Sequence, residues 1–137
     1  MTKEGPFFVG TDIGTLGTKT VVTDSQGVIV GTGYAEYDVL TPHPLWAEQW
    51  PDVWVDGVSK TIREALAKAG VPANAVAGAA ISGLYGGSGV PVDAEMNPLR
   101  PCIIWMDRRA RAEVEWVRNH FDEDELFAVT GNYIDSY

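Results

Sequence analysis

Apolar residues along the chain follow two spacings, one typical of strands and one typical of helices. Short apolar runs separated by glycine and polar residues predict three strands, over residues 7–13, 18–23 and 28–37. Because the links between these runs are short, we expect an antiparallel meander. From Asp52 to about Ala69, apolar residues recur every three or four positions, which predicts a helix. The expected contact face of this helix carries Val55, Val58, Ile62 and Leu66.

The second half of the chain predicts shorter elements. A run of small apolar residues over 76–82 predicts a buried strand. Two briefer runs, 90–92 and 102–105, predict further strands, and the first is expected at a sheet edge because it contains proline. A helix is expected from Asp107, acting as its cap, to about Asn119.

A last short helix is expected to begin at the acidic run 122–125. The order of elements indicates an α/β fold in layers, with a mixed sheet, a three-stranded antiparallel meander and flanking helices. The chain has 137 residues, of which 45% are hydrophobic and 21% charged, a composition that can bury a real core.

Charge and composition narrow the possible partners. The net charge of −9 argues against a nucleic-acid-binding protein, since such proteins neutralise phosphates with basic faces. No apolar run is long enough to span a membrane, and the N-terminus lacks the apolar core of a signal peptide. A cytoplasmic protein is therefore expected. The single cysteine, Cys102, excludes an internal disulfide and is interpreted as a buried, inert thiol.

Candidate chemistry is concentrated where the first predicted strand ends. Asp12 is followed by Gly14 and Gly17, which permit a tight turn and a close approach of the backbone to a ligand. Amide and threonine hydroxyl groups in such a turn suit phosphate oxygens, and a carboxylate beside them suits hydrated Mg²⁺. The segment predicts a site for a metal–nucleotide complex. The alternative is a plain glycine-rich hairpin with a surface aspartate.

Two better-known phosphate motifs do not account for this segment. Residues 17–20 imitate the end of a P-loop, but no glycine stands five residues before Gly17. The turn also leads into a strand, whereas both the P-loop and the dinucleotide-binding fingerprint lead into a helix.

Four stretches in order carry a resemblance to a known family. They are Asp-Ile-Gly-Thr-Leu-Gly-Thr-Lys at 12–19, Trp-Ala-Glu-Gln-Trp-Pro at 46–51, Ala-Ile-Ser-Gly at 80–83, and the run 97–110 containing Ile-Trp-Met-Asp-Arg-Arg. Together they resemble the N-terminal domain of the FGGY carbohydrate kinases, the family of xylulokinase, glycerol kinase and ribulokinase. The Thr-Gly segment from residue 130 also resembles that family.

The resemblance implies an actin-like, ribonuclease-H-like fold and an ATP-dependent kinase acting on a hydroxyl of a ketose or polyol, with a xylulose-like sugar favoured. Residues 1–137 would form the N-terminal part of the first domain, which carries the sugar pocket and the phosphate hairpin. The nucleotide-binding domain and the aspartate that serves as catalytic base would lie beyond residue 137. This chain alone is therefore expected to be inactive.

Site residues follow from the same resemblance. Asp12 would be both the catalytic residue that organises Mg²⁺ and its metal ligand. The phosphates of ATP would be held by Gly14, Thr15, Gly17, Thr18 and Lys19. The sugar would contact Tyr85, Gly86, Trp105, Asp107 and Tyr137.

Several of these residues have simpler interpretations. Lys19 could be a solvated strand residue, Trp105 could be part of the core, and Asp107 could cap a helix as well as bind hydroxyls. A structural role is expected for Glu48, and Arg108 and Arg109 are expected to be surface or helix-support charges. Residues 84–89 lack the Met-His pair of xylulokinases and the Arg-Glu pair of glycerol kinases, which leaves the substrate open.

Two other classes of protein remain as alternatives. One is a truncated or degenerate module that binds a sugar or a partner without catalysis. The other is an actin-like ATPase such as a chaperone or filament protein, which would not need the Trp-x-Asp sugar chemistry at 105–107. A homodimer is a further hypothesis, since a large apolar face rarely stays uncovered.

Overall fold

The computed structural model describes residues 5–83 and 89–136. The described chain divides into two compact units. The first contains the residues up to 39 together with those from 50 to 83, and the second contains the others. Each unit has its own sheet, four-stranded in the first and two-stranded in the second.

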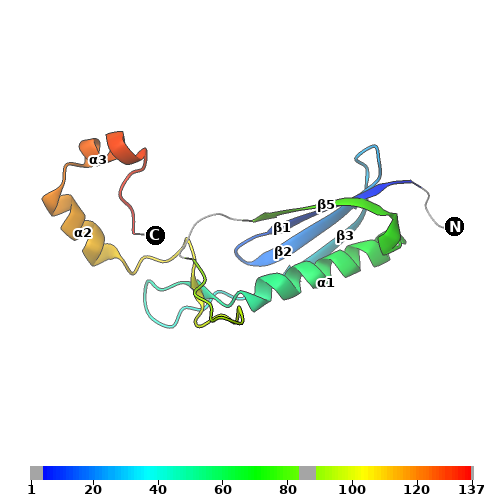
Figure 1. The fold of residues 1–137 in the computed structure, drawn as a ribbon, viewed down its shortest axis with the longest axis horizontal. Helices are drawn as coiled ribbons and strands as arrows, with labels where there is room; N and C mark the ends of the chain where they lie inside the picture. Colours follow the sequence, from blue (N-terminus) through cyan, green and yellow to red (C-terminus); the bar gives the residue numbers. More distant parts are fainter. Residues whose placement is uncertain (1–4, 84–88, 137) are drawn as a thin grey trace. The chain divides into compact units, whose positions relative to one another are not determined.

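The sheet of the first unit is mixed, as the sequence predicts. Its strands are β1 (Phe7–Ile13), β2 (Gly17–Thr23), β3 (Ile29–Glu36) and β5 (Val76–Gly83). They lie in the order β3-β2-β1-β5 (Figure 1). The three N-terminal strands form the expected antiparallel meander, and β5 pairs with β1 in parallel.

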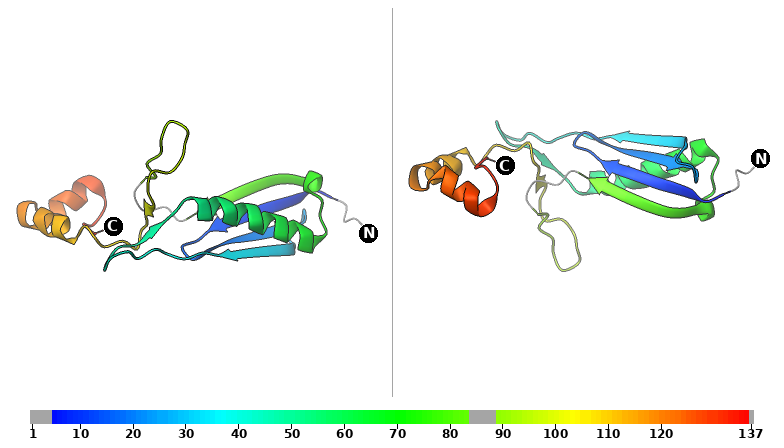
Figure 2. Two further views of the ribbon diagram at one scale, coloured as in Figure 1. Left: turned by 90° about the horizontal axis from the view of Figure 1, so that it is seen from below. Right: turned by 90° about the horizontal axis from the view of Figure 1, so that it is seen from above.

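Helix α1 (Asp52–Ala69) lies across one face of this sheet (Figures 1 and 2). It ends at Gly70, whose φ of 64° is the left-handed conformation that glycine adopts without strain. A short 3₁₀ turn, η1 (Ala73–Ala75), leads into β5. Both ends of the helix agree with the sequence prediction.

The face that α1 presents to the sheet is only partly the predicted one. Val55 is 65% exposed, and Val58, Ile62 and Leu66 are only partly buried. The fully buried positions are instead the small residues Gly57, Thr61, Ala65 and Ala69. Ile62 and Leu66 pack against the edge of the apolar core, beside the contact line that these small residues form.

Two glycines of β3 explain this close packing. A Cβ on Gly31 would lie 2.3 Å from the Ala65 carbonyl oxygen, and one on Gly33 would lie 2.2 Å from the Thr61 carbonyl oxygen. Since neither distance is possible for a real Cβ, the backbones of β3 and α1 approach closely only because both positions lack a side chain. Small residues on the helix complete this fit.

Threonine hydroxyls connect the layers of the first unit. The Oγ1 atom of Thr20 lies 2.8 Å from that of Thr11 and 2.7 Å from that of Thr61, and all three residues are buried. Because each buried hydroxyl has a partner, the ladder ties β1 and β2 to α1 without leaving polar groups unsatisfied. It lies beside an apolar core formed by Phe7, Val9, Val22, Ala65, Ala69 and Val71.

Strand β5 differs from the buried strand that its composition predicts. Only Val76 and Gly78 are partly buried, and Ile81 is 60% exposed. The helix packs mainly over β3 and β2, and no other segment described in this unit covers β5. Its apolar, small-residue composition is that of a strand covered on both faces, but here it forms an exposed edge.

The second unit is built around a short strand pair. Strand β4 (Glu48–Gln49), which the sequence did not indicate, pairs antiparallel with β6 (Cys102–Ile103). The prediction of a strand over 102–105 is therefore correct only for its first two residues. Residues 90–92 form no strand, since Val92 makes just one bridge, to Pro98.

Two helices complete the second unit. Helix α2 (Arg111–His120) begins after Ala110, so the predicted cap at Asp107 is wrong. Helix α3 (Glu123–Thr130) starts as expected, because the Asp122 carboxylate accepts a hydrogen bond from the Glu125 amide. None of the helices within the described ranges is long and apolar enough to cross a membrane.

Candidate functional site

The carboxylate of Asp12 lies in a row of polar side chains across the sheet. Alternation along β1 buries Thr11 beneath α1 and leaves Asp12 exposed on the opposite face. Lys19 on β2 stands directly opposite Asp12, and Ser82 on β5 is its neighbour on the other side. The Lys19 ammonium lies 5.9 Å from the centre of the Tyr34 ring, a cation–π contact.

The turn after Asp12 depends on both of its glycines. The Gly14 amide donates to the Gly17 carbonyl, 3.0 Å away, which closes a tight connection between β1 and β2. A Cβ on Gly14 would lie 3.1 Å from that carbonyl oxygen, and one on Gly17 would lie 2.6 Å from the Ala35 carbonyl oxygen. The phosphate hairpin, defined here as residues 12–19, therefore has a conformation that larger residues would disturb.

Thr18 does not offer its hydroxyl to a ligand. Its side chain is fully buried, and its Oγ1 atom lies 3.3 Å from the hydroxyl of Tyr37. Thr15 is partly exposed, and Lys19 is exposed. Any contribution of Thr18 to phosphate binding would therefore be made by its backbone.

Sequence reasoning missed Tyr37, which follows directly after β3. Its hydroxyl donates to the Gly14 carbonyl, 2.6 Å away, and its amide donates to the Leu16 carbonyl, 3.2 Å away. A partner contact of this kind depends on how β3 pairs with the hairpin. No motif marks it, because the only signal is an aromatic residue at the end of a predicted strand.

The hairpin fits a metal ion that is bound mainly by its nucleotide. Within the part of the chain that the structure describes, no group of three or more His, Cys, Asp or Glu residues could hold a metal ion by itself. Mg²⁺ in phosphoryl-transfer sites is bound through one or two carboxylates together with substrate phosphates. One exposed carboxylate beside a glycine turn agrees with that donor set.

In the second unit, Asp107 is the centre of a buried ion-pair network. It is 2% exposed and accepts a 2.7 Å hydrogen bond from the Ala47 amide. The Arg109 guanidinium donates to both of its carboxylate oxygens at 2.7–2.9 Å. Arg109 also pairs with Glu48 at 2.7 Å and stacks 3.6 Å from the centre of the Trp46 ring.

These contacts give Glu48 the expected structural role, whereas Arg109 is a partly buried ion-pair residue and not the surface or helix-support charge that was predicted. They join the segment containing β4 to the segment after β6, although the two are about 60 positions apart in sequence. Burial opposes ionisation of Asp107, but the hydrogen bonds from Arg109 and Ala47 outweigh it and lower the pKa of the carboxyl. The hydrogen bonds that Arg109 donates to the Asp107 carboxylate raise the pKa of Arg109.

We expect Asp107→Asn to destabilise the second unit by about 2 kcal/mol at pH 7, because it leaves Arg109 partly buried without its main partner. Since the folded pKa is lowered, the wild-type carboxylate stabilises the fold above about pH 4, and this contribution is lost as pH falls through the lowered value. The difference between wild type and variant should therefore shrink in acid. Urea denaturation at pH 7 and pH 3 measures it.

The matched control is Asp93→Asn, in the same unit. Asp93 is only partly buried and its carboxylate is paired with Asn97 and the amides of its own turn, so we expect a smaller loss at pH 7. Equal losses for the two variants would contradict a special role for the buried network.

Of the five residues predicted to contact the sugar, only Trp105 and Asp107 lie within the described residues. The Trp105 side chain is 39% exposed, so it is neither a core residue nor fully open to solvent. The Asp107 carboxylate already accepts hydrogen bonds from Arg109 and the Ala47 amide, as described above. The predicted contacts Tyr85, Gly86 and Tyr137 lie outside the described residues.

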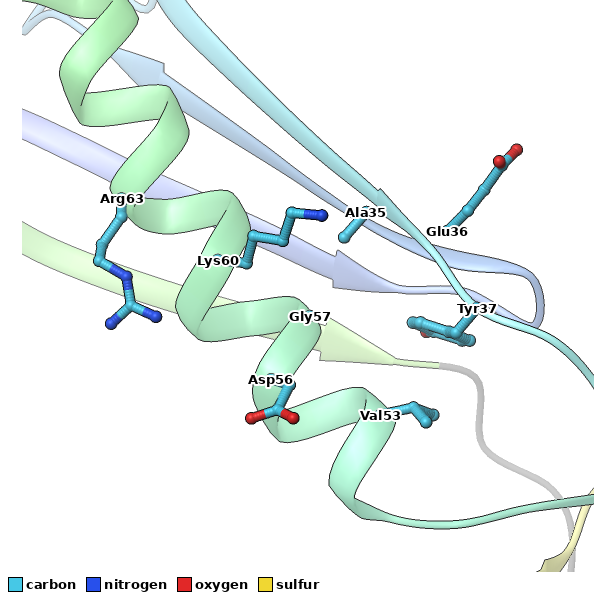
Figure 3. Close-up of a pocket in the computed structure, with 8 residues that line it drawn as sticks. All are labelled: Ala35, Glu36, Tyr37, Val53, Asp56, Gly57, Lys60 and Arg63. Carbon is cyan, nitrogen blue, oxygen red and sulfur yellow. The ribbon is translucent and has the colours of Figure 1, made fainter.

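A groove of about 440 Å³ runs between α1 and the end of β3, within the first unit. Figure 3 shows the Tyr37 side chain pointing from the end of β3 toward the first turns of α1. None of the predicted site residues lines this groove, whose walls are formed by Ala35, Glu36, Tyr37, Val53, Asp56, Gly57, Lys60 and Arg63.

Comparison with known proteins identifies the family. Residues 7–137 match the model of the N-terminal domain of the FGGY family of carbohydrate kinases. The chain belongs to this family. Among FGGY relatives, it is 30% identical to the xylulose kinase of Staphylococcus xylosus, with 93% of this chain and 26% of the relative aligned. It is 33% identical to the glycerol kinase of Delftia acidovorans, over 96% of this chain and 26% of that enzyme.

Solved FGGY structures agree with the fold. A xyloylose kinase from Brucella ovis superposes with a TM-score of 0.79 and 33% identity, covering 95% of this chain and 26% of that one. Plasmodium falciparum glycerol kinase, solved with ADP, gives a TM-score of 0.80 at 18% identity, over 99% of this chain and 28% of that one. The chain thus has the actin-like α/β fold and spans about a quarter of the length of these relatives.

Proposed function

We propose that the protein containing this chain transfers the γ-phosphoryl group of ATP to a hydroxyl of a small ketose or polyol. The observation that carries the proposal is the exposed carboxylate of Asp12 beside a glycine turn, in a chain of the FGGY kinase family. A xylulose-like ketose is the substrate that we favour, and a glycerol-like polyol is the second candidate, since relatives named as xylulose kinases and as glycerol kinases both align over nearly the whole chain.

Phosphoryl transfer requires positioning and charge neutralisation more than covalent chemistry from the protein. In the proposed reaction, the sugar hydroxyl oxygen forms a bond to the γ-phosphorus while the bond from that phosphorus to the β–γ bridging oxygen breaks. ADP leaves, and the hydroxyl proton passes to a general base that we expect beyond residue 137. Mg²⁺ bound with the nucleotide would offset the charge that develops on the phosphate oxygens.

The residues of this chain would then have separate tasks. Asp12 would hold Mg²⁺ and its waters, and Lys19, opposite it on β2, would add positive charge near the phosphates. The backbone of the phosphate hairpin would approach the phosphate oxygens. Trp105 would offer its exposed ring surface to the C–H face of a sugar.

A coupled ADP-release assay on the full-length protein tests the proposal. The panel contains ketoses and polyols, with xylulose and glycerol among them, each with and without Mg²⁺. Sugar-dependent ADP release that requires Mg²⁺ is expected for at least one member, and none is expected from residues 1–137 alone. A full-length protein that binds a sugar but releases no ADP would instead be a non-catalytic binding module.

A further inference from the structure

Three contacts connect the phosphate hairpin to Tyr37, two through its hydroxyl and one through its amide. Tyr37 Oη donates to the Gly14 carbonyl oxygen at 2.6 Å and lies 3.3 Å from Thr18 Oγ1. The Tyr37 amide donates to the Leu16 carbonyl oxygen at 3.2 Å. Tyr37, which follows β3 and is not part of the hairpin, therefore contacts both ends of the turn and its middle.

These contacts set the orientation of a peptide unit in the turn. In a trans peptide, the carbonyl and the following N–H point in opposite directions. A Gly14 carbonyl turned toward the Tyr37 hydroxyl therefore directs the Thr15 amide away from it. Without the hydroxyl, this peptide plane would lose the partner that fixes its rotation, since glycine at position 14 restricts the backbone little.

Helix α1 holds the tyrosine ring from the opposite side. A Cβ on Gly57 would lie 2.8 Å from Thr18 Oγ1 and 3.4 Å from Tyr37 Cε1, so this helix position leaves room only for a residue without a side chain. In Figure 3 the ring lies beside the first turns of the helix. The ring is thus confined between α1 and the hairpin that it supports.

We propose that Tyr37 is a positioning residue that holds the phosphate hairpin in the conformation that binds the phosphates of ATP. The inference rests on the proposed function, because it assigns the hairpin to a nucleotide. Burial raises the pKa of the Tyr37 phenol, and the charge of Asp12 adds to the rise. The hydroxyl consequently stays protonated and can donate to Gly14 over the range in which enzymes work.

Tyr37→Phe, which removes only the hydroxyl, tests the proposal in the full-length protein. We expect kcat/KM for ATP to fall about five- to tenfold, the size of effect expected when the partly buried hydrogen bonds of one hydroxyl are lost, while KM for the sugar is unchanged. Amide hydrogen exchange without ligand should accelerate at residues 14–17 and stay unchanged in the core of β1 and β2. Tyr133→Phe, at a ring that is 78% exposed, is the matched control.

Two readouts separate this proposal from the function on which it rests. Hydrogen exchange needs neither nucleotide nor sugar, and binding of Mg²⁺ with a non-hydrolysable ATP analogue needs no sugar. Unchanged exchange at the hairpin, or equal losses for ATP and sugar, would overturn the positioning role. A wild-type protein that binds no nucleotide would overturn the proposed function, and faster hairpin exchange in Tyr37→Phe would still show that Tyr37 fixes the turn.

Discussion

Asp12→Asn is expected to lower kcat for sugar phosphorylation by about 10²–10³-fold in the full-length protein, while the fold stays intact. The amide keeps the size of the side chain but removes the negative charge that would hold Mg²⁺ and its waters. Because Asp12 is exposed on the face opposite α1, the change removes no packing contact, and thermal unfolding should hardly move. The coupled ADP assay at saturating sugar measures kcat.

Asp56→Asn is the control for this charge change. Asp56 is also an exposed aspartate of the first unit, but it lies on α1 and outside the phosphate hairpin. We expect its kcat to match wild type. Measuring the rate at a series of Mg²⁺ concentrations adds a second check. Weaker metal binding should raise the Mg²⁺ concentration needed for the half-maximal rate in Asp12→Asn alone. If Asp12→Asn retained full activity and the same Mg²⁺ dependence, the carboxylate would have no part in catalysis.

The second large effect concerns stability. Gly33→Ala is expected to destabilise the first unit by about 3 kcal/mol, the upper end of the usual cost of overpacking. The new methyl group would lie 2.2 Å from the Thr61 carbonyl oxygen and 2.9 Å from the carbonyl carbon. These are helix backbone atoms, which no side-chain rotation can move away. The helix would have to shift, and the hydrogen bond between Thr61 and Thr20 would shift with it.

Gly10→Ala provides the matched control within the same sheet. Its Cβ would meet only the Val21 Cγ2 atom, at 3.5 Å, which is an ordinary contact. We expect a neutral or slightly stabilising effect, because alanine reduces the freedom of the unfolded chain. Urea denaturation of both variants measures the difference. An insoluble Gly33→Ala beside a soluble Gly10→Ala would agree with the prediction, and equal stabilities would contradict it.

The parts of the fold that depend on near neighbours could be predicted from the sequence. The meander follows from apolar runs with short links, and the end of α1 follows from Gly70. Asp12 with its glycine turn could likewise be recognised, because its residues are adjacent in the chain. Such features are encoded locally, so reasoning from a short window is sufficient.

Features that depend on distant partners were missed or misjudged. The contact face of α1 depends on Gly31 and Gly33 of β3, which lack side chains and let the helix approach closely. The spacing of apolar residues within the helix contains no information about these two positions. Strand β4 is defined by its pairing with the distant β6, and Asp107 pairs with Arg109 where a helix cap was predicted. Tyr37 belongs to the same class, since its role appears only when β3 is placed beside the hairpin.

The interleaving of the two units has a consequence for how the protein is made. Glu48 is synthesised before α1 and β5, but its partner Arg109 follows 61 residues later. At a synthesis rate of about 5–20 residues per second, that separation corresponds to a delay of roughly 3–12 s. The strands and helix of the first unit can assemble during this interval, while β4 waits for β6. Folding on the ribosome should therefore begin with the first unit, while the first stretch of the second unit, residues 40–49, waits unpaired until its second stretch has been made.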